Sequence, residues 1–96
     1  MRKLRKFENY LDEVLKDPAE AANYLNAAYK EDEETFLLAL QDVARARGVS
    51  AVAKATGLQR EGLYKMLSKK GNPQYRSLLA VLDSMHLGIQ IVPKAA

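Results

Sequence analysis

The sequence contains no cysteine, no tryptophan and a single histidine. Without cysteine, the chain has no disulfide framework, no thiolate metal ligand and no cysteine nucleophile, which fits a reducing cytoplasm. His86 has no second histidine and no carboxylate cluster beside it, so we expect no metal site and no cofactor. We place His86 at a helix end, where its charged form would interact with the helix dipole. No Ser–His–Asp arrangement and no glycine-rich phosphate loop is visible, so we do not expect an enzyme.

Long hydrophobic runs, low-complexity tracts and internal repeats are also missing. The longest apolar stretches fall far short of the roughly 20 residues that cross a bilayer. The basic start MRKLRKF is followed by the acidic stretch FENYLDEVLKD rather than by the apolar core of a signal peptide. A chain of 96 residues has room for one core. We therefore expect one soluble, cytoplasmic unit without membrane contact.

The net charge of +3 results from two halves of opposite sign. Residues 1–44 hold six Lys/Arg and ten Asp/Glu, a net charge of −4, whereas residues 45–96 hold nine and two, a net charge of +7. Scattered solvated charge would give no such separation. A basic half suits a polyanionic partner and an acidic half suits a basic one, so two partners are plausible.

The hydrophobic pattern predicts helices almost throughout. Asp17 and Asp32 are capping residues for helices over about 18–30 and 32–47, and Glu20 could complete a capping box with Asp17. Two short helices, about 50–55 and 59–67, precede a longer one over 75–87 that Gly88 ends. The alternating tail Ile-Gln-Ile-Val, residues 89–92, predicts a short β-strand that would need a partner, such as its own copy in a second subunit. We divide the chain into an N-terminal arm, 1–16, and a domain, 17–96.

The stretch GVSAVAKATGLQREGLYKMLS, residues 48–68, predicts a helix-turn-helix unit. A small residue, Ala53, allows close crossing of the two helices, and Gly57 suits a left-handed turn between them. Leu63 would fill the angle between the helices together with Val52, Leu58 and Leu67. A three-residue turn that contains glycine is typical of the DNA-reading motif, although an ordinary helical hairpin can share the pattern.

If the second helix reads DNA, its first residues face base edges. Arginine can bond bidentately to guanine, glutamine to adenine, and glutamate can accept from cytosine. The candidate base-reading residues are Gln59, Arg60, Glu61, Tyr64 and Lys65. The candidate phosphate contacts are Ser50, Lys54, Lys69, Lys70 and Asn72. For each lysine a plain solvated side chain is an equal alternative, and Tyr64 could be a half-buried ring that exposes only its hydroxyl.

The stretch from Arg47 to Ile91 resembles the helix-turn-helix core of the addiction-module antidote proteins, the HigA-like antitoxins of bacterial toxin–antitoxin pairs. The resemblance rests on the runs RGVS, REGLYK, LS, GNP, LL, VL and LG, and the upstream stretch DPAEAANYLNAAYKEDEETFLLALQDVARA extends it. It implies an all-α, five-helix, lambda-repressor-like fold, here with the short C-terminal β-strand. It further implies a homodimer that binds operator DNA of its own operon, and a RelE/HigB-like toxin as partner. Gln59 departs from the family, which more often has a capping serine there.

Three functional hypotheses follow. The first is an antitoxin that represses its own promoter and neutralises a toxin, with Glu31, Glu33 and Glu34 as tentative toxin contacts on the acidic half. A plainer interpretation is that these acids only cap and solvate a helix start. The second hypothesis is a stand-alone, phage-type repressor without a toxin. The third is a protein-interaction module whose helix-turn-helix no longer binds DNA.

Overall fold

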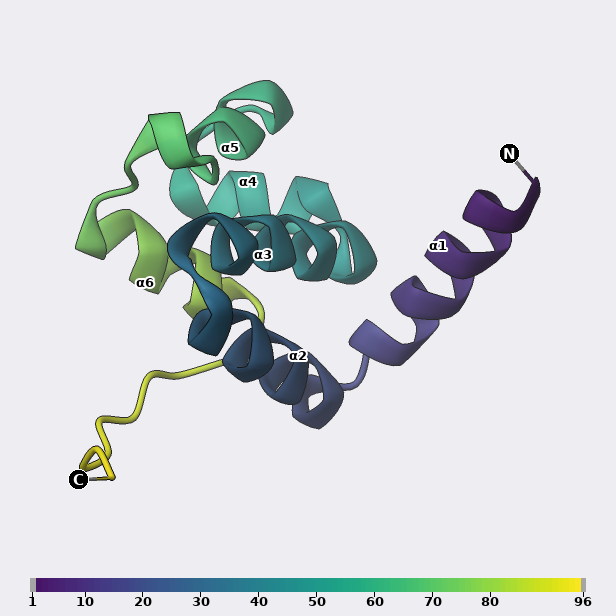
Figure 1. Ribbon diagram of the computed structural model, residues 1–96. Coiled ribbons are helices and arrows are strands. Elements are labelled where there is room, and N and C mark those ends of the chain that lie inside the picture. Colours follow the sequence, from purple (N-terminus) through teal and green to yellow (C-terminus); the bar gives the residue numbers. More distant parts are fainter. Residues whose placement is uncertain (1, 96) are drawn as a thin grey trace.

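The computed structural model describes residues 2–95, and in this part of the chain every regular element is a helix (Figure 1). The elements are, in order, α1 (Arg2–Leu15), α2 (Pro18–Glu31), α3 (Glu33–Arg47), α4 (Val49–Thr56), α5 (Arg60–Met66), the 3-10 turn η1 (Lys69–Gly71) and α6 (Tyr75–Ser84). The all-α prediction is confirmed. The described residues form six α-helices rather than five, because the segment predicted as an N-terminal arm is largely the helix α1.

The predicted helix caps at the two aspartates are confirmed. The Asp17 carboxylate accepts the Ala19 N–H at 3.1 Å, and Pro18 follows in the first helical position. The Asp32 carboxylate accepts the Thr35 N–H at 2.7 Å and so caps α3. The predicted capping box does not form at Asp17, because its own backbone N–H donates to the Val14 carbonyl at 3.2 Å.

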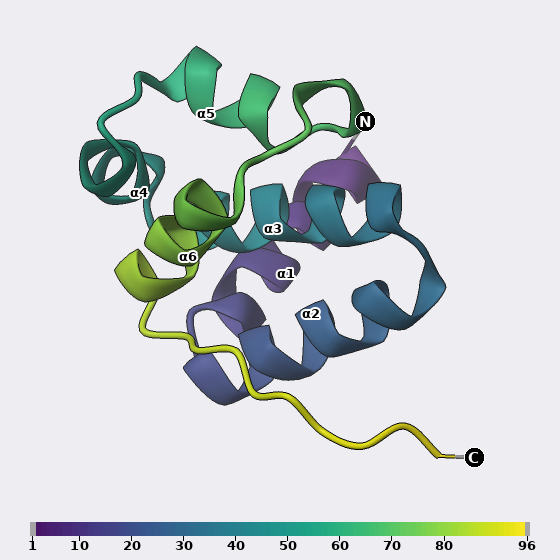
Figure 2. The ribbon, with the colours of Figure 1, turned by 90° about the vertical axis from the view of Figure 1, so that its left-hand side faces the viewer.

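Helix α3 is the centre of the molecule, in contact with α1, α2, α4 and η1, while α6 packs on α4 (Figure 2). On the stripe of α3 that helical spacing predicts, Leu40, Val43 and Ala44 are fully buried, whereas Phe36 and Arg47 at its two ends are partly buried. The predicted stripe on α2 is buried as well, through Ala21, Leu25 and Ala28. No buried polar or charged residue is found among the side chains that the structure describes, so the core is held by apolar packing.

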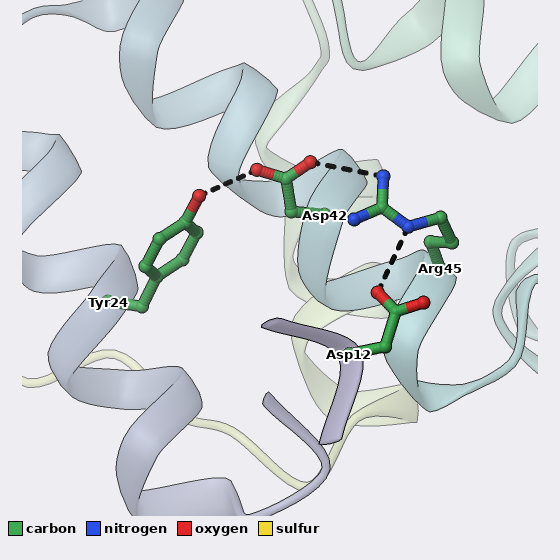
Figure 3. Close-up of polar contacts among 4 residues, drawn as sticks. All are labelled: Asp12, Tyr24, Asp42 and Arg45. Carbon is green, nitrogen blue, oxygen red and sulfur yellow. Dashed lines mark hydrogen bonds and ion pairs between the residues drawn. The ribbon is translucent and has the colours of Figure 1, made fainter. Parts of the chain in front are cut away.

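A polar network ties α1, α2 and α3 together at the edge of this core (Figure 3). The Arg45 guanidinium binds Asp12 at 3.1 Å and Asp42 at 3.4 Å, and the Tyr24 hydroxyl donates to Asp42 at 2.7 Å. Partial burial, together with the hydrogen bond to Asp42, raises the pKa of Tyr24 to about 12. The network thus places α1 on α3, which the helical periodicity of either segment alone does not predict.

Two predictions at the C-terminal end are wrong. Residues 89–92 form no strand, because a strand needs a neighbouring backbone for its hydrogen bonds and no segment among residues 2–95 lies beside the tail as a second strand. The last helix ends at Ser84 rather than at Leu87, because His86 adopts the left-handed conformation with φ 61°. The Leu87 N–H then donates to the Leu82 carbonyl at 2.9 Å and closes the helix, so His86, not Gly88, is the turning residue.

Candidate nucleic-acid interface

Helices α4 and α5 are joined by the three residues Gly57, Leu58 and Gln59. Gly57 has φ 73° and ψ 15°, the left-handed conformation that the sequence predicts, and the Leu58 N–H closes α4 by donating to the Ala53 carbonyl at 3.0 Å. Ala53 and Leu63 are buried between the helices, as their positions predict. Leu58 differs from its prediction, because the residue is 38% exposed, although its side chain lies beside Gly62.

The candidate base-reading residues lie together on α5 and at its start. Gln59 is the N-cap residue, but its side chain makes no capping hydrogen bond and is exposed. Arg60 and Glu61 form the exposed first turn, and Tyr64 and Lys65 follow four residues after each of them, so the two pairs lie on adjoining stripes of the helix surface. Lys65 is exposed and Tyr64 is half-buried. The arrangement leaves charged and amide groups of α5 available to a ligand.

The candidate phosphate contacts flank α5 on two elements. Ser50 and Lys54 are both exposed and lie one turn apart on α4. Lys69, Lys70 and Asn72 are exposed on and after η1. Lys69 also faces the start of α3. The pKa of the Asp32 carboxyl is lowered mainly by hydrogen bonds from Thr35 and further by the positive charge of Lys69. Lys69 is therefore shared between this surface and an acidic neighbour.

Sequence reasoning missed the residues that fix the C-terminal end of α5. The Gln41 side-chain amide, on α3, donates to the Leu67 carbonyl at 2.7 Å and reaches the Tyr64 carbonyl at 3.5 Å. The Ser68 hydroxyl donates to the Lys65 carbonyl at 2.6 Å. Gly71 packs directly on this end of the helix, since a Cβ there would overlap the Lys65 carbonyl oxygen. A polar residue on the otherwise apolar side of α3 is the one sequence signal that could have pointed to Gln41.

The acidic half separates into carboxylates that the fold uses and carboxylates that it leaves exposed. Asp12 and Asp42 belong to the Arg45 network, and Glu13 pairs with Lys16 at 2.8 Å. The tentative toxin contacts Glu31, Glu33 and Glu34 are all exposed around the connection between α2 and α3, and no ion pair of theirs is found within residues 9–95.

A groove of about 360 Å³ lies where α2, α6 and the C-terminal tail meet. Its apolar lining includes Leu25, Phe36 and Leu78, and the tail forms one wall through Leu87 and Ile89. Among the described residues, no group of three or more potential metal ligands occurs. Within the same part of the chain, no helix has the length and apolar character that a membrane span requires.

These features define a small all-helical protein with exposed basic residues around α5 and exposed acidic residues between α2 and α3. The family model for probable addiction module antidote proteins matches residues 3–93, and the chain belongs to this family. A curated Haemophilus influenzae protein, named there as an uncharacterized protein, is 42% identical over 80 residues, which make up 82% of each chain. No solved structure gives a significant match. The predicted membership among antidote proteins is confirmed, and it implies a toxin partner of some kind.

Proposed function

We propose that this protein is an antitoxin that binds the operator DNA of its own operon as a homodimer and neutralises a RelE/HigB-like toxin. The observation that carries the proposal is the exposed polar face of α5, which a three-residue turn joins to α4 in a chain of the antidote family. This arrangement favours the HigA-like helix-turn-helix subtype. We place the protein in the cytoplasm, where its DNA is.

In this proposal α5 is the recognition helix. Arg60 bonds to a guanine, Gln59 to an adenine, and Glu61 accepts from a cytosine, while Tyr64 and Lys65 contact the next bases or the backbone. The absence of a capping hydrogen bond at Gln59 supports this role, because its amide stays available for DNA. Ser50, Lys54, Lys69, Lys70 and Asn72 hold the phosphates on either side.

The homodimer follows from the size of the reading surface, because one subunit covers one half-site of an operator. Two recognition helices would then lie about 34 Å apart, one turn of DNA. The exposed side chains of Ile89, Ile91 and Val92, beside the apolar groove, are the proposed contact between subunits. Deletion of residues 89–96 should then convert the dimer to a monomer in light scattering at micromolar concentration. A truncated protein that is still dimeric would place the interface elsewhere.

DNA binding is tested with the duplex immediately upstream of the coding sequence and a scrambled duplex of the same length. Arg60→Ala should weaken binding to the upstream duplex by roughly 1–3 kcal/mol and leave the scrambled duplex nearly unaffected, because base contacts discriminate. Lys70→Ala is the matched phosphate variant and is preferable to Lys69→Ala, since Lys69 also acts on Asp32. It should weaken both duplexes about equally and flatten the salt dependence. Equal losses on both duplexes for Arg60→Ala would make Arg60 a backbone contact.

Toxin binding is tested by reversing the charge of the exposed acids. The triple variant Glu31→Lys, Glu33→Lys and Glu34→Lys should no longer rescue the growth of a cell that expresses the toxin encoded beside it. Its affinity for the toxin should fall most strongly at low salt. Operator binding should hold or rise. The control Glu13→Lys, Glu20→Lys and Asp83→Lys has the same total charge change on other exposed carboxylates. Of these, Glu13 forms an ion pair with the exposed Lys16, and such surface pairs contribute little to stability. If both triple variants lose toxin binding equally, the loss is an effect of net charge. If neither variant loses toxin binding, the interface lies elsewhere.

A further inference from the structure

The C-terminal end of α5 obtains its hydrogen-bond partners from outside the helix. The last four carbonyls of any helix lack partners within it. Here the Lys65 carbonyl accepts from the Ser68 hydroxyl, and the Tyr64 and Leu67 carbonyls face the Gln41 amide on α3. Gln41 is separated from Leu67 by 26 positions in the sequence, so this is a tertiary contact and not a local cap. It links the central helix directly to the end of the helix that we assign to DNA.

The chemistry of the contact requires a donor with the reach of glutamine. Both acceptors are backbone carbonyl oxygens, and the side-chain NH₂ of glutamine carries two donor hydrogens. The contact is partly buried, so a group that cannot donate would leave the Leu67 carbonyl without that bond in a setting where water reaches it less readily. Methionine has the same chain length without the donor. Glutamate has the same shape but, when ionised, presents only acceptors to the two carbonyls.

Because α5 is short, the contacts at its C-terminal end also affect where its N-terminal residues lie. Seven residues of α-helix span only about 10 Å, and one end is fixed by η1 and Gln41. A tilt of about 10° at that end would displace Arg60 by roughly 1.6 Å, given a rise of about 1.5 Å per residue. A displacement of this size breaks a bidentate contact to a base edge, whereas a flexible lysine on a phosphate can follow it.

We propose that Gln41 is a positioning residue for DNA recognition, which fixes the angle of α5 through the carbonyls of Leu67 and Tyr64. The inference rests on the proposed function, because it assigns the DNA-reading role to α5. Gln41 touches no DNA itself. Its loss should therefore reduce discrimination between sequences more than it reduces binding as such.

The test compares Gln41→Met and Gln41→Glu with the wild type. The matched control is Gln74→Met, at the exposed N-cap of α6, where the side chain makes no capping hydrogen bond. Hydrogen exchange on the free protein reports the anchor itself. In both Gln41 variants the amides of Leu63 and Leu67, which donate to the Gln59 and Leu63 carbonyls along α5, should exchange about tenfold faster, while amides of α2 keep their rates. Helical circular dichroism verifies that each variant is folded. The second measurement is the ratio of affinities for the upstream duplex and the scrambled duplex, which should fall about tenfold in the Gln41 variants.

Faster exchange at Leu63 and Leu67 together with a reduced affinity ratio, both absent in Gln74→Met, supports the proposal. Unchanged exchange would overturn it, because α5 would then not depend on Gln41. Faster exchange with an unchanged ratio would also overturn it, since the anchor would serve stability alone. If the wild type itself does not discriminate between the duplexes, the DNA-reading role of α5 is wrong, and faster exchange would still establish the anchor as a feature of the fold.

Discussion

Substitution of Gly71 by alanine tests whether this position requires glycine because space is short rather than because of its backbone conformation. Gly71 has an ordinary negative φ, so alanine meets no conformational penalty there. The difficulty is space, because the added Cβ would overlap the Lys65 carbonyl oxygen and lie 2.6 Å from that of Met66. Both neighbours are backbone atoms that belong to α5, so the η1 turn would have to move. The move would strain the hydrogen bond of 2.9 Å from the Gly71 N–H to the Ser68 carbonyl.

The cost of such overpacking is typically about 1–3 kcal/mol. For a domain of this size each kcal/mol lowers the melting temperature by roughly 4–8 °C, so Gly71→Ala should unfold about 5–20 °C below the wild type. The assay is thermal unfolding followed by circular dichroism. Gly62→Ala is the matched control, because its Cβ would meet Leu58 at an ordinary 3.8 Å within a helix. Alanine should stabilise that position by about 0.5–1 kcal/mol. A Gly71→Ala variant that melts with the wild type, while Gly62→Ala melts higher, would refute the steric argument.

Three further predictions concern single residues. Gly57→Ala should lower the free energy of unfolding by about 1–2 kcal/mol in urea titrations, because φ at this position is 73°. Space is not the reason, since nothing lies within 4 Å of the added Cβ, and Gly57→Asn should lower the free energy of unfolding by less. His86→Gly should instead raise the free energy of unfolding by about 0.5–1 kcal/mol, since glycine adopts φ 61° without strain. The folded-state pKa of Tyr24, about 12, lies above its ordinary 10.0, so the stability it contributes is complete below pH 10 and is lost as the pH rises toward 12. The wild type should therefore lose stability more steeply than Tyr24→Phe over this pH interval, and equal slopes would contradict the raised pKa.

Local signals in the sequence were sufficient for most helix boundaries. The caps Asp17 and Asp32 and the left-handed Gly57 are each determined by the chemistry of one residue and its immediate neighbours. The stripes on α2 and α3 follow from helical periodicity alone. These features could be predicted because they depend on residues close together in the chain.

One failure is local, and the others occurred where distant residues decide the outcome. The prediction that Gly88 ends the last helix was wrong because His86 already closes α6 in the left-handed conformation, which histidine adopts less readily than glycine. The strand at 89–92 was wrong because β-branched residues indicate only a tendency, and pairing requires a second segment. Within the candidate site, the exposed positions on α5 were predictable from the motif, but the Gln41 contact joins residues on two helices that pack at an angle no sequence pattern specifies.

The way the helices follow one another has a consequence for how fast the chain folds. Most packing joins helices that are neighbours in the sequence, and the pairs α1–α3, α4–α6 and α3–η1 reach past only one or two elements. No sheet has to be assembled from distant parts of residues 2–95. Domains with such low contact order fold on the order of microseconds to milliseconds, since little loop-closure entropy is lost before contacts form. We therefore expect stopped-flow refolding from urea to be nearly complete within the instrument's dead time, and a newly made chain to reach its folded state well before a second one is synthesised.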